Sequence, residues 1–275
     1  MKKRILFVLV AAIVAITSVS LVGCGSSGDN GKDDWQYIKD NGKLIVGLDD
    51  TFAPMGFRDD DNNIVGFDID LAKAVGKELG VDVEFKAIEW KAKEQELKSK
   101  KIDCIWNGMS VNKDREKEMT LSKEYLLNKI VLVSMKKNIN VKSAADLKNV
   151  KIGTQAESSA LEKMESNKEY KNFKDNIKEY DTYDDAIMDM KAGRVDVVAI
   201  DDVLAEYKKK NMDDPLYFCT YDLGADYYAI GFRKGDTELA NKVNKAIKAT
   251  IDSGEAKKIS DKWFGKDIVV YRSYK

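Results

Sequence analysis

The chain has 275 residues with 46 basic side chains, 47 acidic side chains and no histidine, so its formal net charge is −1. This balance excludes the strongly basic surface of a nucleic-acid-binding domain. The absence of histidine excludes Ser-His-Asp and Cys-His catalysis and every histidine-ligated metal site. No GxxxxGK[ST] phosphate loop occurs either. Catalysis would have to rely on Glu, Asp, Lys or Tyr, and we expect no metal and no cofactor.

Residues 1–23 have the pattern of a secretion signal. Three basic residues precede an apolar run, and the sequence LVGC fits the lipobox of bacterial lipoprotein signal peptides. We predict cleavage before Cys24, acylation of its thiol, and a flexible tether over residues 24–34. A single membrane-spanning anchor is the alternative, because the apolar run is nearly long enough to span a bilayer. The lipobox favours a protein held by lipid on the outer face of the bacterial cytoplasmic membrane.

Beyond the tether, short β-branched runs alternate with helical patterns. Only two prolines interrupt this alternation, which predicts α/β units with mainly parallel sheets. The remaining length of about 240 residues suffices for one large domain or two of ordinary size. We expect strands at 43–48, 81–88, 102–106, 129–136, 151–155, 194–200 and 227–234, and helices at 68–80, 93–100, 183–192 and 238–252.

Aromatic, hydroxyl and charged residues follow the carboxyl ends of these strands. In open α/β sheets, ligands bind at that edge, where the loops gather. We therefore expect these residues to converge on one binding site. In chain order they are Asp49, Phe52, Trp90, Asn107, Gly108, Met109, Ser110, Arg115, Ser158, Ser159 and Asp201.

From Lys43 to Gly265 the chain resembles the polar amino-acid-binding proteins of ABC importers. This is family 3 of the bacterial extracellular solute-binding proteins, which includes histidine, lysine/arginine/ornithine and glutamine receptors. The matching stretches, in the family's order, are GLDDTFAPM, GFDIDLAKAVGKELG, SVNKDREKEM, KIGTQAESSA, AGRVDVVAIDD, YYAIGFRKG and ISDKWFG. The resemblance implies a periplasmic-binding-protein-like α/β fold, with two α/β lobes joined by two crossover strands around a ligand cleft. Lobe 1 is expected at 35–128 plus 224–275, and lobe 2 at 129–223.

The resemblance also implies a function. The chain would be a lipid-anchored, extracytoplasmic solute-binding protein that captures a polar L-amino acid and delivers it to a membrane-embedded ABC permease with its ATPase. We expect a monomer that is not an enzyme and binds no nucleic acid. The alternatives are a cyclohexadienyl-dehydratase-like enzyme on the same fold and a ligand sensor for a separate signalling partner. The enzyme would need a general acid in the cleft, for which Glu89 and Glu157 are the candidates.

For the ligand's charged groups, the resemblance implies partners of opposite charge. The guanidinium of Arg115 would bind the α-carboxylate in a planar, bidentate pair. The backbone N–H of Ser110 and the turn at 158–159 would share that carboxylate. The carboxylate of Asp201 would bind the α-ammonium, helped by backbone acceptors around Gly108. Both charges need a partner because an unpaired charge in a closed cleft is costly.

For the ligand's side chain, Phe52 and Trp90 match an aromatic pair that encloses it, and Asp49 matches a carboxylate at its far end. Three positions depart from the family's pattern: Glu157 stands where many relatives have glycine, Asn107 replaces a small or hydroxyl residue, and Met55 follows Pro54 where an aromatic residue is common. Because these departures fall in or beside the pocket, basic, glutamine-like and cystine ligands all remain open.

Overall fold

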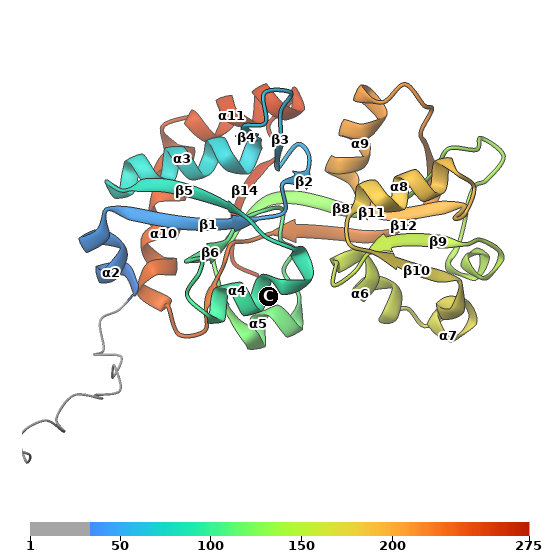
Figure 1. The fold of residues 1–275 in the computed structure, drawn as a ribbon, viewed down its shortest axis with the longest axis horizontal. Helices are drawn as coiled ribbons and strands as arrows, with labels where there is room; N and C mark the ends of the chain where they lie inside the picture. Colours follow the sequence, from blue (N-terminus) through green and yellow to red (C-terminus); the bar gives the residue numbers. More distant parts are fainter. Residues whose placement is uncertain (1–33, 275) are drawn as a thin grey trace, which may run out of the picture. The chain divides into compact units, whose positions relative to one another are not determined.

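The computed structural model describes residues 34–274 (Figure 1). The predicted signal peptide, Cys24 and the tether up to residue 33 lie outside the described residues. Within residues 34–274, no helix is both long enough and apolar enough to cross a lipid bilayer.

The first sheet has the strand order β5-β1-β6-β13-β7. β1 pairs in parallel with both β5 and β6, whereas β13 is antiparallel to β6 and β7. The carboxyl ends of three neighbouring strands therefore meet at one edge. In Figure 1, α3 and α11 lie on one side of this sheet and α4 and α5 on the other. The strands are β1 (Lys43–Leu48), β5 (Asp82–Ala87), β6 (Cys104–Ile105), β7 (Met119–Leu121) and β13 (Gly231–Arg233).

The second sheet has the order β10-β9-β11-β8-β12, and β14 also pairs with β8. β10, β9 and β11 are parallel, and β8 is antiparallel to both β11 and β12. A small third sheet joins β2, β3 and β4 beside the first one. These strands are β2 (Thr51–Phe52), β3 (Gly56–Arg58), β4 (Ile64–Val65), β8 (Glu124–Ser134), β9 (Ile152–Gln155), β10 (Ile177–Tyr180), β11 (Val197–Asp201), β12 (Tyr217–Tyr228) and β14 (Val269–Arg272).

Most of the helices lie in the connections between strands, whereas α2 precedes the first strand. α3 shows why they form: its apolar residues recur at helical spacing, and it ends at Gly80, whose φ of 71° closes a left-handed cap. The helices are α2 (Asp34–Asn41), α3 (Phe67–Leu79), α4 (Lys93–Lys98), α5 (Lys113–Glu118), α6 (Ser159–Glu165), α7 (Tyr170–Phe173), α8 (Tyr183–Lys191), α9 (Asp202–Asn211), α10 (Thr237–Asp252) and α11 (Glu255–Phe264). Three 3-10 turns are η1 (Trp90–Ala92), η2 (Ala144–Asn149) and η3 (Lys174–Asn176).

The fold is that of a periplasmic binding protein. Each of the two larger sheets carries helices and forms the centre of one α/β lobe. The chain passes from the first sheet to the second along β8 and returns along β12, so these two long strands are the crossovers (Figure 1). The lobe boundaries given above stay a prediction.

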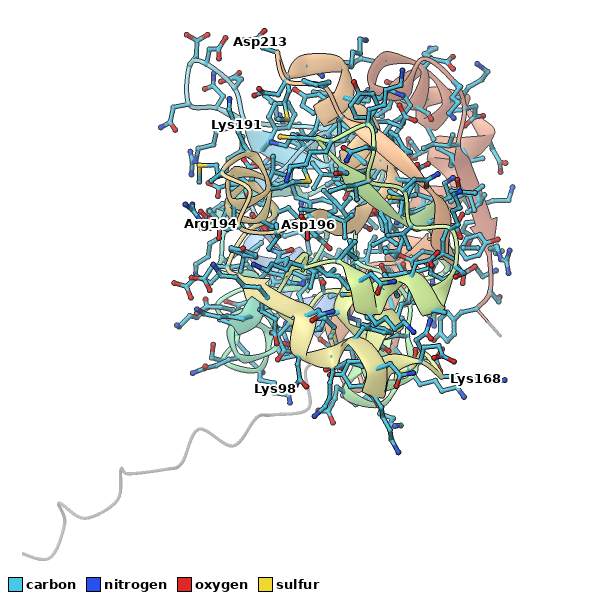
Figure 2. The ribbon with its side chains drawn as sticks, turned by 90° about the vertical axis from the view of Figure 1, so that its right-hand side faces the viewer. Lys98, Lys168, Lys191, Arg194, Asp196 and Asp213 are labelled. Atoms are coloured by element: carbon cyan, nitrogen blue, oxygen red, sulfur yellow. The ribbon has the colours of Figure 1, made fainter. Side chains whose placement is uncertain are left out.

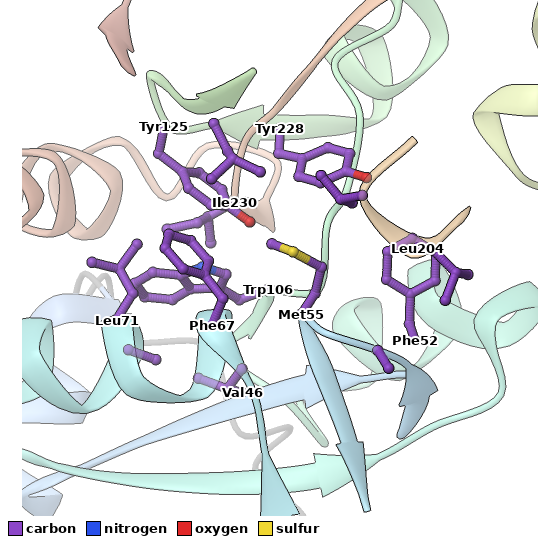
Figure 3. Packing of buried hydrophobic residues seen from close by; sticks show 14 of the residues in the cluster. Val46, Phe52, Met55, Phe67, Leu71, Trp106, Tyr125, Leu204, Tyr228 and Ile230 are labelled. Carbon is purple, nitrogen blue, oxygen red and sulfur yellow. The ribbon is translucent and has the colours of Figure 1, made fainter. Parts of the chain in front are cut away.

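The core packs aromatic rings directly beneath the edge where the strands end. Trp106, Tyr125 and Tyr228 are fully buried, and Trp106 meets Tyr125 edge-on with 6.1 Å between ring centroids. Figure 3 shows Met55 between this group and Phe52, which faces Leu204. These large, rigid side chains hold the loops after β1 and β6 in place.

The surface carries charges of both signs. Lys98, Lys168 and Asp213, labelled in Figure 2, are exposed on the outside of the molecule. This mixed distribution matches the near-balanced composition.

Two predicted strands differ most from the observed ones, and the strand expected at 194–200 begins only at Val197. The strand expected at 129–136 begins earlier, at Glu124, and the strand expected at 227–234 is divided between the end of β12 and β13. β12 also extends back to Tyr217 through Asp222 and Gly224, two residue types that are rare in strands. Pairing with β8 overrides their low propensity, and at Ala229 the chain leaves β8 to join the first sheet.

Candidate functional site

One cavity lies where the carboxyl ends of both sets of parallel strands meet. It encloses about 270 Å³, counting its open mouth. It contains ten of the eleven predicted residues and two that the sequence analysis missed, Gln155 and Tyr183. The lining residues are Asp49, Phe52, Trp90, Asn107, Gly108, Ser110, Arg115, Gln155, Ser158, Ser159, Tyr183 and Asp201.

Met109 is the one predicted residue that does not line the cavity. Its side chain is fully buried in an apolar cluster that includes Trp90, Ile105 and Met119. Its carbonyl accepts a hydrogen bond from the N–H of Ala229 at 2.8 Å. Met109 thus joins the loop after β6 to the chain entering β13.

Arg115 is a buried cation that neutral groups hold in place. It lies in α5, whose N-cap Asn112 accepts from the Arg115 N–H at 2.7 Å. The guanidinium donates to the carbonyl of Ser110 at 2.7 Å and to the carbonyl of Glu157 at 3.3 Å, and it lies 5.7 Å from the Trp90 ring centroid. None of the ion pairs within residues 34–274 involves Arg115. Its charge is therefore fixed in the cavity wall without a carboxylate counter-charge.

Asp201 is a buried carboxylate that also has only neutral partners. Its Oδ1 accepts from the hydroxyl of Tyr228 and from the amide of Asn128, both at 2.7 Å, and its Oδ2 accepts from the hydroxyl of Tyr183 at 3.3 Å. Burial raises the pKa of Asp201 to about 7, and the charge of Asp226 adds to that effect. No cation in the described part of the chain forms an ion pair with it. Asp49, described below, is a second lining carboxylate that forms no ion pair within the described residues, so the cavity has one such cation, Arg115, and two such carboxylates.

Serine hydroxyls connect the two sides of the cavity. Ser110 follows β6 and Ser159 begins α6, and their Oγ atoms lie 2.9 Å apart. Ser158 is the N-cap of α6 and its hydroxyl accepts from the N–H of Leu161 at 3.2 Å. Ser158 therefore caps α6 while it lines the cavity.

The far end of the cavity is formed by Asp49 and aromatic rings. Asp49 accepts from the N–H and hydroxyl of Thr51 at 2.9 and 2.7 Å and from the amide of Gln155 at 2.8 Å. Burial raises the pKa of this carboxyl above its ordinary value. Phe52 packs on Tyr183 with 5.9 Å between the ring centroids. The indole N–H of Trp90 is directed to the carbonyl of Glu157 at 3.2 Å.

The backbone of Glu157 explains why glycine suits this position. Its φ is +56°, in the left-handed region that glycine adopts without cost. In that conformation the carbonyl accepts from both Trp90 and Arg115. The side chain itself is exposed. The departure noted in the sequence therefore leaves the carbonyl's role unchanged and places an extra carboxylate outside the cavity.

Asp68 was missed, although it positions the loop after β6. Its Oδ2 accepts from the N–H of Gly108 at 2.7 Å and its Oδ1 from the hydroxyl of Tyr125 at 2.8 Å. Burial raises the pKa of Asp68 to about 7. The sequence contained a signal, because Asp68 lies three and seven residues before Leu71 and Val75 and so shares their apolar helix face. For Gln155 and Tyr183 the only signal in the sequence was position, because Gln155 ends a predicted strand and Tyr183 begins a predicted helix.

A family model, related sequences and a solved structure each match most of the chain. Residues 44–266 match the model of the bacterial extracellular solute-binding proteins, family 3. An arginine-binding extracellular protein of Bacillus subtilis is 35% identical over 265 residues, covering 95% of this chain and 98% of that protein. An L-cystine-binding protein of the same organism is 32% identical over 271 residues, covering 94% and 98%. A substrate-binding protein of an ABC uptake transporter from Streptococcus pneumoniae, solved with bound histidine, superposes with a TM-score of 0.82 at 37% identity, covering 87% of this chain and 99% of that one.

The first testable prediction concerns Gly108, which has a φ of +56°. A Cβ there would lie 2.7 Å from Cε1 of Phe52, so Gly108→Ala must both strain the backbone and displace the ring. The backbone alone should lower the free energy of unfolding by about 1–2 kcal/mol. Gly42→Ala is the matched control, because Gly42 has a φ of +67° and open space around it. In urea denaturation we expect Gly108→Ala to cost more than Gly42→Ala; equal costs would contradict the tight packing of Gly108 on Phe52.

Proposed function

Since the chain belongs to the bacterial extracellular solute-binding proteins of family 3, we propose that it captures one free polar L-amino acid outside the cell and delivers it to an ABC importer. The observation that carries this proposal is the pair of unpaired charges in the cavity, Arg115 and Asp201. A free amino acid has one carboxylate and one ammonium group. Binding it would give each of the two buried charges a partner of opposite sign, which offsets the cost of burying that charge.

The positions of the lining residues support a role for each end of the ligand. Arg115 would bind the α-carboxylate, with Ser110 and the turn at 158–159 beside it, and Asp201 would bind the α-ammonium. These groups are held by neutral hydrogen-bond partners, so their geometry is set without their charge being neutralised. The side chain of the ligand would then extend between the aromatic rings toward Asp49.

Contacts across the cavity support closure of the two lobes over the ligand. With lobe 1 at 35–128 plus 224–275 and lobe 2 at 129–223, several contacts join the lobes, and three of them involve the far end of the cavity or its rim. Gln155 donates to Asp49, Trp90 donates to the Glu157 carbonyl, and Lys91 pairs with Asp181 at 2.9 Å. A closed lobe pair of this kind excludes water from the site and presents a distinct surface to a transporter.

We limit the ligand to the class of polar L-amino acids. Two of the relatives described above are named for binding arginine and cystine, and the third was solved with bound histidine; these ligands differ in the side chain. Asp49 suits a basic side chain by charge, and its neighbour Gln155 suits a neutral polar one by hydrogen bonding. The same relatives are named for binding, and we propose binding without catalysis here too.

We further propose that the protein is a lipid-anchored monomer. The lipobox ending at Cys24 supports acylation of that thiol, which would hold the protein on the outer face of the cytoplasmic membrane. A second membrane-attachment signal would strengthen such an anchor. The permease that receives the ligand, together with its ATPase, would lie in the same membrane.

A thermal-unfolding screen of residues 31–275 tests the function. The ligands are the twenty common L-amino acids together with cystine and ornithine. A ligand present at 100 times its dissociation constant stabilises the folded state by about 2.7 kcal/mol. For a chain of this size the midpoint should rise by roughly 5–10 °C. We expect a rise with at least one polar amino acid; a flat result across the whole panel would overturn the proposal.

Replacing either unpaired charge should abolish binding. In Arg115→Ala or Asp201→Ala the ligand's own charge would lose its partner in a closed site, a cost of roughly 3–5 kcal/mol. That corresponds to more than a hundredfold loss of affinity by isothermal titration calorimetry. Arg58→Ala is the control, because Arg58 pairs with Asp50 on the surface outside the cavity. An affinity within threefold of wild type in either cavity variant would contradict the assigned role.

The lipid anchor has a separate test in the full-length protein. Cys24→Ala removes the thiol that would be acylated, so the protein should leave the membrane fraction and lose incorporation of labelled fatty acid. Ser26→Ala, two residues further along, should change neither property. If Cys24→Ala remains in the membrane fraction and still incorporates the label, the lipobox interpretation fails.

A further inference from the structure

A further buried carboxylate, Asp226, lies behind the cavity on the crossover strand β12. It is 4% exposed and stands opposite Asn128 of β8 in the strand register. Its Oδ2 accepts from the hydroxyl of Ser110 and from the amide of Asn128, the latter at 3.3 Å. Asp226 does not line the cavity, but it contacts a residue that does.

The amide of Asn128 joins Asp226 to Asp201. The same Nδ2 that donates to Asp226 also donates to Oδ1 of Asp201, at 2.7 Å. Two buried carboxylates thus share one neutral donor, and neither forms an ion pair within residues 34–274. Two like charges this close disfavour full ionisation of both groups.

The charged neighbours of Asp226 do not offset this repulsion. The charges of Lys163 and Arg115 act to lower the pKa of Asp226, but neither group forms an ion pair with it within residues 34–274, and the ammonium group of Lys163 donates to the carbonyl of Ala225 at 2.9 Å. Burial is the largest effect on both carboxyls: it raises the pKa of Asp226, and it raises that of Asp201 to about 7. The titratable and charged groups that face the pair from the surrounding elements are Arg115 of α5, Glu162 and Lys163 of α6, Glu124 of β8, Tyr183 of α8 and Tyr228 of β12.

We propose that Asp201 and Asp226 share one proton while no ammonium group occupies the cavity, and that the ammonium group of an arriving amino acid expels this proton into solvent. The proposal rests on the proposed function, because it needs an amino-acid ligand. The charges balance. The pair carries −1 with the proton bound, and it carries −2 beside a ligand ammonium of +1 after the proton has left. Asp226 acts as a positioning residue that sets the protonation state of Asp201.

The coupling has a definite sign. Above about pH 7 the pair of carboxyls has already lost the shared proton, so ligand binding releases no proton from it. Below that pH the ligand must displace the proton, and its dissociation constant should rise by up to tenfold for each pH unit. Binding is therefore strongest at neutral to alkaline pH and weakens as the pH falls from 7 toward 5.

The first experiment uses the ligand-free protein and so does not depend on the proposed function. Carbon-13 NMR of the aspartate carboxyl carbons is followed from pH 4 to pH 9. We expect a titration near pH 7 that Asp226→Asn shifts to lower pH, because the neighbouring charge has been removed. The control Asp202→Asn removes the adjacent carboxyl, which lies outside the cavity, and should leave the titration near pH 7 unchanged. If the carbons of Asp201 and Asp226 both titrate below pH 5, the proposal is overturned.

The second experiment counts protons during binding. Isothermal titration calorimetry is performed with L-arginine, or with L-cystine or L-glutamine if arginine gives no heat, in two buffers of different ionisation enthalpy. We expect about one proton released per ligand at pH 6 and almost none at pH 8. In Asp226→Asn the release at pH 6 should fall below half of the wild-type value, while Asp202→Asn should match wild type.

The outcomes separate this inference from the proposed function. Binding with no buffer-dependent heat at pH 6 would overturn the shared proton and leave the binding function standing. Equal proton release in wild type and Asp226→Asn would remove Asp226 from the mechanism. Should Asp226→Asn fail to fold, the wild-type proton count and the pH dependence of its dissociation constant still decide the question. Absence of binding to the whole amino-acid panel would instead count against the proposed function.

Discussion

The structure is organised around buried charges that form no ion pair within residues 34–274. Arg115 and Asp201 are both buried, and both are held only by neutral carbonyl, amide and hydroxyl groups. Such partners fix the position of a charge and satisfy part of its hydrogen-bonding capacity, but they leave most of the desolvation penalty in place. The cavity is therefore preorganised for a molecule with complementary charges, and that molecule would provide the missing stabilisation.

This arrangement depends on backbone geometry as much as on side chains. The loop after β6 reverses at Gly108 with a positive φ, and Asp68 holds the Gly108 N–H from the core side. On the opposite side of the cavity, the left-handed backbone of Glu157 directs its carbonyl toward Trp90 and Arg115. The guanidinium is consequently held by two carbonyls from separate segments, and its position changes if either segment moves.

Sequence reasoning found most of the cavity because one rule of α/β sheets places functional loops at the carboxyl ends of strands. That rule, with the family resemblance, identified ten lining residues from five separate segments. It missed residues whose roles arise only in the tertiary structure. Asp226 lies 116 residues from the Ser110 hydroxyl that it accepts from, and it falls in the part of β12 that was not predicted as a strand. Met109 was included because it lies between cavity residues, but its side chain packs on the opposite side of the loop.

The two ends of the cavity differ in how firmly they are specified. Arg115 and Asp201 are each fixed by partners on several elements, whereas Asp49 is fixed by Thr51 and Gln155, with its Oδ2 bound to Gln155 alone. A carboxylate oxygen can accept more than one hydrogen bond, so Asp49 retains capacity for a further donor. Under the proposed function, recognition of the α-carboxylate and α-ammonium would stay constant while small changes near Asp49 would alter which side chain is accepted.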